Sequence, residues 1–237
     1  MPAKFLIALL LFIGQPTLLA VAEEPSDATT AAIELYKSQD YRAAFDAFSA
    51  LSDDDPIAQY YLANMYAGGQ GAEPDTEKAL KWFIASAEQG HAKAQFKTGL
   101  AFNEGFGTKK DPAAAINWFI KAADQGIAGA QFYLAVAYQQ GEYVKKDMLK
   151  AVKWMKQAAK HGISEAQTNL GNFYNEGIGV RQDNELAFAW YSIAALSGNE
   201  QAEQSQQVLV TKMTPEEVKE GEALAKKIYS RMTSSTH

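Results

Sequence analysis

The sequence contains no cysteine, so neither disulfides nor cysteine-based metal sites can stabilise the protein. A lipid anchor attached to a cysteine is excluded for the same reason. Proline is scarce and falls only in loops or at expected helix starts, and no segment alternates apolar and polar residues with a period of two. These absences argue against a disulfide-rich domain or a β-sheet protein. They indicate a helical chain stabilised by packing alone.

Histidine is also scarce. His91, His161 and His237 lie far apart, and none has a second metal ligand at the usual spacing. No phosphate-binding loop, dinucleotide fingerprint or nucleophile elbow occurs either, so we predict no metal and no cofactor. Acidic residues outnumber basic ones by 28 to 22, which gives a net charge of −6. Since nucleic-acid binding needs a basic surface, we expect no nucleic-acid partner.

Residues 1–22 differ in kind from the rest of the chain. Lys4 precedes a nine-residue apolar run from Phe5 to Ile13, and Ala20-Val21-Ala22 forms a small-x-small cleavage site before Glu23. This pattern is typical of a secretory signal peptide, and the apolar run is too short to span a membrane. An uncleaved anchor is the alternative. We therefore expect an exported protein, periplasmic or secreted, with no stable membrane insertion after cleavage.

Residues 58–198 repeat themselves with a period of 36. The tryptophans, the aspartates before them and the glycines after them all keep this spacing: Trp82, Trp118, Trp154 and Trp190; Asp75, Asp111, Asp147 and Asp183; Gly90, Gly126, Gly162 and Gly198. A fixed period of this size is the signature of a repeat architecture. We therefore predict four repeats, at 58–93, 94–129, 130–165 and 166–201.

Each repeat is expected to contain two helices joined by a glycine turn. In the first copy, Ala58 to Ala67 forms the first helix, and the second runs from the N-cap Asp75 to Gly90. Between the helices lie glycine pairs that permit positive φ, at Gly69 and Gly71, Gly105 and Gly107, and Gly177 and Gly179. In the third copy Tyr143 replaces the second glycine after Gly141, so we expect that turn to differ slightly.

The tryptophans fall on the alanine-rich face of the second helix. A small residue stands on the first helix of each copy, where it lets the two helices approach closely while the indole fills the gap. These small residues are Ala63, Gly99, Ala135 and Gly171. We therefore predict that the tryptophans form the core. A stacking platform for sugars is the alternative.

Taken together, these motifs resemble the Sel-one-like repeat family, a relative of the tetratricopeptide repeat. They are Ala-x-x-x-Leu-Gly/Ala, a Gly-x-Gly turn, the Asp, Lys-Ala-x-x-Trp and Ala-Ala-x-x-Gly, and the resemblance covers residues 58–198. It implies an all-α fold, a right-handed α/α superhelix, whose members usually act as adaptors in protein complexes, often in bacterial envelopes. We therefore expect a non-enzymatic scaffold with a protein or peptide partner.

The flanking segments are expected to cap this solenoid, which makes 31–230 a single domain. Residues 31–54 resemble a helical hairpin, preceded by a flexible lead-in at 23–30. Thr214, Pro215 and Glu217 match a capping box, so residues 202–230 are predicted to form polar capping helices. We expect a disordered tail at 231–237.

The first helices line the concave side in tetratricopeptide-like superhelices, so we predict that they form a groove that binds a partner segment. The outer copies are polar there and the central ones apolar, which is the anatomy of a recognition surface. The alternative is that these side chains pack against the neighbouring repeat. The candidate residues are Tyr60, Asn64, Phe96, Leu100, Asn103, Phe132, Val136, Gln139, Thr168 and Asn172.

The loops before two of the capping aspartates carry lysine pairs, Lys109-Lys110 and Lys145-Lys146. Stacking of neighbouring repeats would place both pairs on one rim, where they could steer an anionic partner. An ordinary solvated loop is the alternative.

An envelope protein that binds peptidoglycan, or a weak β-lactamase, is the alternative function, since some exported relatives have been described as weak penicillin-binding β-lactamases. A serine β-lactamase needs Ser-x-x-Lys, and no Ser of this chain is followed by Lys at the third position. We therefore predict no catalytic residue. Nitrocefin turnover that is lost on groove mutation would favour the alternative.

Overall fold

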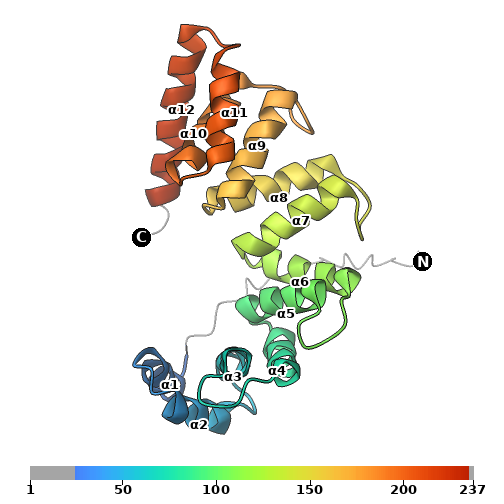
Figure 1. Cartoon of the computed structure of the whole chain (residues 1–237), viewed down its shortest axis with the longest axis vertical. Coiled ribbons are helices and arrows are strands. Elements are labelled where there is room, and N and C mark those ends of the chain that lie inside the picture. Colours follow the sequence, from blue (N-terminus) through green and yellow to red (C-terminus); the bar gives the residue numbers. More distant parts are fainter. Residues whose placement is uncertain (1–24, 235–237) are drawn as a thin grey trace, which may run out of the picture.

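The computed structural model describes residues 25–234, and all regular secondary structure in that range is α-helical. The helices stack in chain order into a curved, elongated array (Figure 1). They are α1 (Asp27–Lys37), α2 (Tyr41–Leu51), α3 (Pro56–Gly68), α4 (Thr76–Glu88), α5 (Ala92–Glu104), α6 (Pro112–Asp124), α7 (Ala128–Gln140), α8 (Met148–Lys160), α9 (Ser164–Glu176), α10 (Asn184–Leu196), α11 (Glu200–Val210) and α12 (Pro215–Ser234). The predicted all-α solenoid is confirmed. The predicted signal peptide lies outside the described residues.

Each repeat is a pair of thirteen-residue helices. In the first repeat α3 packs against α4, and α4 packs in turn against α5 of the next repeat; the same contacts recur along α5–α10. The apolar face that one hairpin would leave exposed is therefore covered by the next hairpin. The first helices begin two residues before the predicted repeat starts. In α3 this is because Pro56 occupies the first turn and Asp55 is the N-cap.

The predicted helix caps are confirmed in all four repeats. The carboxylate of Asp75 accepts a hydrogen bond from the backbone N–H of Lys78 at 2.9 Å, and this bond lowers the pKa of Asp75. The equivalent aspartates make the same bond at 2.8–3.0 Å. The glycines after the second helices all have positive φ, as the caps require; they are Gly90, Gly126, Gly162 and Gly198.

The glycine turns lie against the preceding repeat. A Cβ on Gly107 would fall 2.2 Å from the carbonyl oxygen of Thr76, so this position has no room for a side chain. In the third turn Tyr143 keeps the left-handed conformation, with φ of 58°, and its side chain is 62% exposed. The expected difference is therefore not in the sign of φ. It lies in a residue that is strained at positive φ and whose side chain is largely exposed.

The prediction that the tryptophans form the core is confirmed in full for Trp190, holds in part for Trp82 and Trp154, which pack against the core clusters, and is wrong for Trp118. Trp82, Trp118 and Trp154 are only half-buried. The core position belongs to the next residue, which faces the small residue of the first helix and is at most 4% exposed in every repeat: Phe83, Phe119, Met155 and Tyr191. Successive helical residues are about 100° apart, so the indole lies beside the core position, and Trp82 and Trp154 pack there against the edges of the core clusters.

Trp190 is the buried exception, and α12 is the reason. This helix packs against α10, and Gly221 lets it come close, since a Cβ there would lie 2.7 Å from the ring of Phe188. Ala225 joins the cluster that contains Trp190, with Leu224, Ile228 and Met232 packed around it. The last indole is therefore covered by the capping helix and is only 5% exposed.

The capping segments follow the prediction except at their outer limits. The lead-in was expected to be flexible through residue 30, but α1 begins at Asp27, because Ser26 caps it by accepting from Thr29 N–H. The tail was expected to be disordered from residue 231, but α12 continues to Ser234. Residues 23–24 and 235–237 lie outside the described part. The capping box is confirmed, since Glu217 accepts from Thr214 N–H at 2.7 Å and Thr214 Oγ1 accepts from Glu217 N–H at 3.3 Å.

Candidate functional site

The predicted groove residues lie on the first helices α3, α5, α7 and α9, and none of their side chains is fully exposed. The aromatics of the first three sets pack at the junction with the following repeat, and Tyr60 does so through His91, the N-cap residue of α5. The Tyr60 ring lies 4.8 Å from the His91 ring, measured between centroids. The Phe96 ring fits against Gly129, where a Cβ would fall 2.5 Å from Cζ. Phe132 packs into the cluster around Ala166 of the fourth repeat. At these three positions the structure favours the alternative of packing between repeats.

Three polar candidates form hydrogen bonds within the chain. Asn64 Nδ2 donates to the carbonyl of Tyr60 at 2.7 Å, and Thr168 Oγ1 donates to the carbonyl of Ser164 at 3.0 Å. Asn172 Oδ1 accepts from Tyr191 Oη at 2.7 Å, and burial raises the pKa of Tyr191 to about 12, so this phenol stays protonated as a donor. These three side chains therefore contribute hydrogen bonds to the fold.

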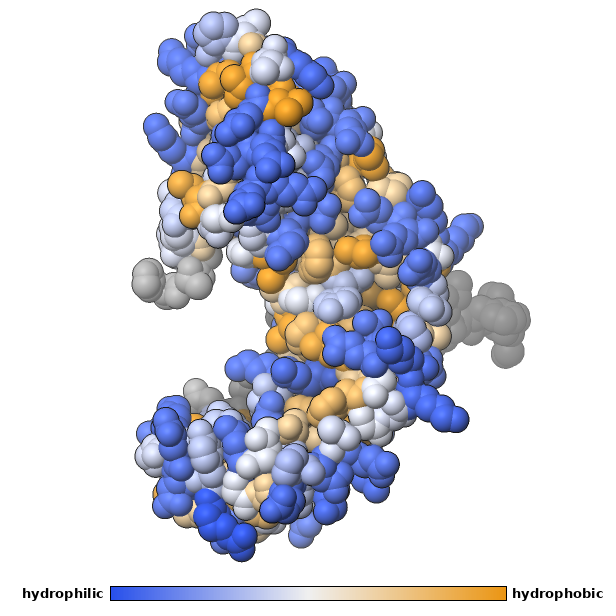
Figure 2. Space-filling view, in the orientation of Figure 1, coloured by the Kyte–Doolittle hydropathy of each residue, from blue (hydrophilic) through white to orange (hydrophobic). Residues whose placement is uncertain are grey.

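The remaining four candidates form a matched pair on neighbouring repeats. Leu100 and Val136 are half-buried, spaced by 36 residues, and border the clusters of their repeats. One turn further along, Asn103 and Gln139 are also half-buried, and neither makes a hydrogen bond with another described residue. Figure 2 shows apolar side chains gathered over the middle of the visible face, across α5–α7. An apolar contact and an amide with free hydrogen-bonding capacity thus recur in register.

The lysine pairs lie on the loops as predicted, and all four side chains are exposed. Two of them also serve the turn. Lys110 and Lys146 lie over the first glycine, since a Cβ on Gly105 would meet Cγ of Lys110 at 3.0 Å and one on Gly141 would meet Cβ of Lys146 at 2.9 Å. The stems cover the turn while the ammonium groups reach water. Lys109 and Lys145 have no such contact with a glycine.

Sequence reasoning missed a buried glutamine on the first helix of each repeat, which we call the glutamine series: Gln59, Gln95, Gln131 and Gln167. All four are at most 5% exposed, and each Nε2 donates to a backbone carbonyl of the preceding helix or its C-cap. The signal was present in the sequence, because an Ala-Gln pair opens every 36-residue copy. Each of these glutamine side chains lies in the core and links its repeat to the preceding helix or its C-cap.

The first three members of the series also bond through their Oε1 to the residue thirty positions later. Gln89 and Gln125 donate to Gln59 and Gln95 at 2.8 Å, and His161 Nδ1 lies 3.1 Å from the Oε1 of Gln131. The fourth repeat has Ser197 at this position, and Gln167 Oε1 has no partner among the described residues. The series therefore ends with a buried acceptor that lacks its donor.

Neither a metal site nor a membrane-spanning helix is found in the described part. No three His, Asp or Glu side chains between residues 25 and 234 come together as a metal site would require. Within the same range, no helix combines the length and the apolar character needed to cross a bilayer.

The helix pairs, their caps and the 36-residue period recur in known proteins. The Sel1 repeat profile matches residues 56–91, 92–127, 128–163 and 164–199, well over half of the chain. The chain belongs to the Sel1 repeat family. The matched units have the same bounds as the helix pairs, from the first residue of one first helix to the N-cap of the next. The resemblance predicted from the motifs is confirmed.

Two solved structures extend this comparison. A Sel1 repeat protein from Oxalobacter formigenes is 34% identical, with a TM-score of 0.68 over 75% of this chain and 73% of that one. A protective antigen of uropathogenic Escherichia coli that displays an SLR fold is 28% identical, with a TM-score of 0.62 over 88% of this chain but only 54% of that longer one. No curated protein sequence matches.

Proposed function

We propose that this Sel1 repeat protein is an exported scaffold that binds an extended segment of a protein partner on the surface of α5 and α7. Membership of the family supports the role as a scaffold, since Sel1 repeats commonly serve protein–protein interaction. The signal-peptide pattern of residues 1–22 supports export. The periplasm is the expected compartment if the source is a Gram-negative bacterium.

One observation supports this binding surface. Leu100 with Asn103 and Val136 with Gln139 place the same pair of chemical groups on two neighbouring repeats. An extended peptide has backbone donors and acceptors along its whole length, so amides at a fixed spacing can bond it while Leu100 and Val136 hold its apolar side chains. Tyr60, Phe96 and Phe132 stiffen this surface by packing between repeats. The exposed lysines of the two loops add positive charge that would speed the approach of an acidic segment.

The test is a peptide selection followed by binding measurements with the selected sequence. Leu100→Glu and Val136→Glu should each weaken binding of that peptide by at least tenfold while the helical circular dichroism signal stays unchanged. Leu149→Glu is the matched control, because Leu149 is 74% exposed on α8 and should leave binding within twofold of wild type. Equal binding by all three variants would place the partner elsewhere on the protein.

The contribution of the lysine pairs is tested separately by salt. Binding of an acidic peptide should weaken as salt rises from about 0.05 to 0.5 M, because exposed charges are screened over a few ångströms at high ionic strength. Replacing Lys109 and Lys145 by Gln should flatten this dependence. Binding that does not respond to salt would exclude the steering role.

Export is tested by expressing the full chain in a Gram-negative host and fractionating the cells. We expect the protein in the periplasmic fraction with Glu23 as its first residue. A chain that stays in the cytoplasm with Met1 intact would contradict this part of the proposal and leave the binding surface untouched.

A further inference from the structure

Buried apolar clusters join neighbouring units along most of the array. One cluster joins the N-terminal cap to the first repeat, with Phe48 of α2 and Leu62 of α3 among its members. A second joins α6 of the second repeat to α7 of the third, and another joins the third repeat, the fourth repeat and α12. Within the described part of the chain, no such cluster joins α4 of the first repeat to α5 of the second. This junction therefore lacks the apolar contact that fastens the others.

Thr98 on α5 explains the gap. The equivalent positions of the other repeats hold leucines that are at most 1% exposed and belong to the clusters that join each repeat to the preceding unit: Leu62, Leu134 and Leu170. Thr98 is 0% exposed as well, but it is smaller, and its Oγ1 has no hydrogen-bond partner among residues 25–234. A buried hydroxyl without a partner favours states in which water reaches it. Threonine at this position therefore weakens the contact between α4 and α5.

The second helix of its own repeat holds α5 more firmly. Phe119 of α6 packs directly against the backbone of α5, where a Cβ on Gly99 would fall 2.6 Å from the ring. The half-buried Phe96 and Leu100 of α5 pack against the cluster of α6 and α7. Since α5 is fastened on this side, we expect it to move with the second and third repeats. The weak surface is the one that α5 presents to the first repeat.

The contacts that remain across the junction are few and mostly polar. Gln95 Nε2 donates to the carbonyl of Ala87 at 3.2 Å, and the ring of His91 lies against that of Tyr60. The half-buried Phe106, on the loop after α5, packs against the cluster of α3 and α4. A hydrogen bond that is exchanged for one with water changes the free energy little. The loop contact can therefore keep the two repeats connected while α5 moves against α4.

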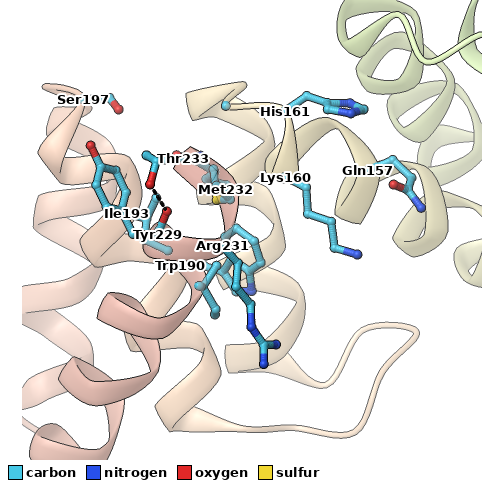
Figure 3. A pocket seen from close by; sticks show the side chains of 13 residues that line it. Gln157, Lys160, His161, Trp190, Ile193, Ser197, Tyr229, Arg231, Met232 and Thr233 are labelled. Atoms are coloured by element: carbon cyan, nitrogen blue, oxygen red, sulfur yellow. Dashed lines mark hydrogen bonds between the residues drawn. The ribbon is translucent and has the colours of Figure 1, made fainter. Parts of the chain in front are cut away.

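The opposite end of the array is braced by α12. Figure 3 looks into a cavity of about 740 Å³ that is lined by residues of α8, α10 and α12, with Trp190 and Met232 among them. Trp190 of α10 and Ala225 of α12 belong to the same buried cluster as Met155 of α8. The capping helix thus ties the third repeat to the fourth, which makes their junction a rigid reference for the junction between α4 and α5.

We propose that the junction between α4 and α5 is a hinge. Helices α1–α4 form one arm, and α5–α12 form the other. In Figure 1, α1–α4 are the lower arm of the curved array, and Figure 2 shows the hollow that opens on the left between the two arms. Movement about the hinge changes the width of this hollow, so the scaffold can admit partners of different sizes. Because α5 and α7 lie on the same arm, the hinge does not depend on the proposed binding surface.

Distances between spin labels test the hinge, since a chain without cysteine takes labels only at introduced cysteines. The last residue of each second helix is exposed: Glu88, Asp124, Lys160 and Leu196. The pair Glu88→Cys with Lys160→Cys crosses the hinge, whereas Asp124→Cys with Leu196→Cys does not, and both pairs span two periods. Pulsed electron spin resonance should give a distance distribution about twice as broad for the first pair. Equal widths would overturn the proposal.

Substitutions of Thr98 test the cause. Thr98→Leu supplies the side chain of the other repeats and should narrow the distribution of the pair at 88 and 160 to the width of the reference pair. Thr98→Val keeps nearly the same volume and removes the unpaired hydroxyl, so it should narrow the distribution even where leucine does not fit. Thr98→Ser keeps the hydroxyl and should leave the distribution broad. Unchanged widths in both Thr98→Leu and Thr98→Val would contradict the inference.

Leu134→Thr makes the reciprocal change at the junction between the second and third repeats. It should broaden the distribution of the reference pair at 124 and 196, which crosses that junction, while circular dichroism shows that the helices remain. A folded Leu134→Thr variant with an unchanged distribution would mean that this leucine position does not fasten the repeats. Leu100→Glu should leave both distributions as in wild type, so a failure of the proposed binding surface is distinguishable from a failure of the hinge.

Discussion

Phe119 lies directly against the backbone of Gly99. A Cβ on Gly99 would fall 2.6 Å from Cε1 of the ring, closer than side chains in folded proteins approach. The same relationship holds between Gly171 and Tyr191, where the distance is 2.5 Å. Two repeats therefore use a missing side chain to bring the helices of a pair together over an aromatic ring. The other two place Ala63 opposite Phe83 and Ala135 opposite Met155.

Gly99→Ala is expected to destabilise the protein by about 1–3 kcal/mol, the usual cost of an overpacked core. Gly68→Ala is the matched control. It also lies on a first helix, but its added Cβ would make only ordinary contacts with Gln70, at 3.5 Å or more. That change should stabilise by up to about 1 kcal/mol, because alanine loses less backbone entropy.

Urea denaturation gives both values. Adding Phe119→Met to Gly99→Ala recreates the Ala135–Met155 pair and should restore part of the loss. A double variant no more stable than Gly99→Ala would show that the clash is not with the ring.

Phe119→Ala should cost much more stability than Trp118→Ala. Phe119 is 1% exposed, so its truncation leaves a cavity and should cost about 3–5 kcal/mol. Trp118 is half-buried, with Lys121 Nζ 4.0 Å from its ring centroid, and its loss should cost about 1–2 kcal/mol. Thermal or urea unfolding compares the two variants. A larger loss of stability in Trp118→Ala than in Phe119→Ala would show that Trp118 is the core residue.

Tyr143→Gly should stabilise the protein by up to about 1 kcal/mol. A residue with a Cβ is strained at positive φ, and glycine removes this strain, although its higher entropy in the unfolded chain offsets part of the gain. Tyr143→Ala is the control, since it removes the exposed ring but keeps the Cβ. A rise in melting temperature in Tyr143→Ala that equals the rise in Tyr143→Gly would attribute the effect to the ring.

His91 should make stability depend on pH. Its Nδ1 accepts from the backbone N–H of Ala94 at 3.2 Å and so caps α5, and burial, with Lys93 nearby, lowers the pKa of His91 below 6.5. A lowered pKa means that the unfolded chain binds the proton first. Stability should therefore hold above about pH 6.5, the usual His pKa, and fall as the pH drops through that value towards the folded pKa.

His91→Asn tests this dependence with a residue that cannot titrate. The equivalent position before α11 is Asn199, whose side chain accepts from Ala202 N–H at 3.0 Å, so asparagine preserves the cap. Melting temperatures between pH 7.5 and 5.5 should fall less in this variant than in wild type. Identical pH profiles would mean that His91 does not contribute.

The sequence by itself determined the repeat unit, its period and its helix ends. These depend on local chemistry: Asp75 bonds an amide three residues away, Gly90 adopts a conformation that other residues avoid, and Thr214 with Glu217 caps its own helix. The placement of the candidate groove residues on the first helices was also predictable, because a 36-residue period carries each position from copy to copy. Helix limits were less certain: the cap that Ser26 provides for α1 was not recognised, and α12 continues past its predicted end to Ser234.

Only the tertiary structure decided which side of each helix is buried. A difference of one residue turns a side chain by about 100°. Phe119 rather than Trp118 therefore fills the core, because the ring of Phe119 lies against Gly99 of α5. The same holds for Tyr60 and Phe96, which the neighbouring repeat covers. It holds for α12, whose packing on α10 buries Trp190, and for Gln167, which lacks a donor because Ser197 lies where the other repeats have a longer side chain. Long-range packing, rather than the local pattern, decides such contacts.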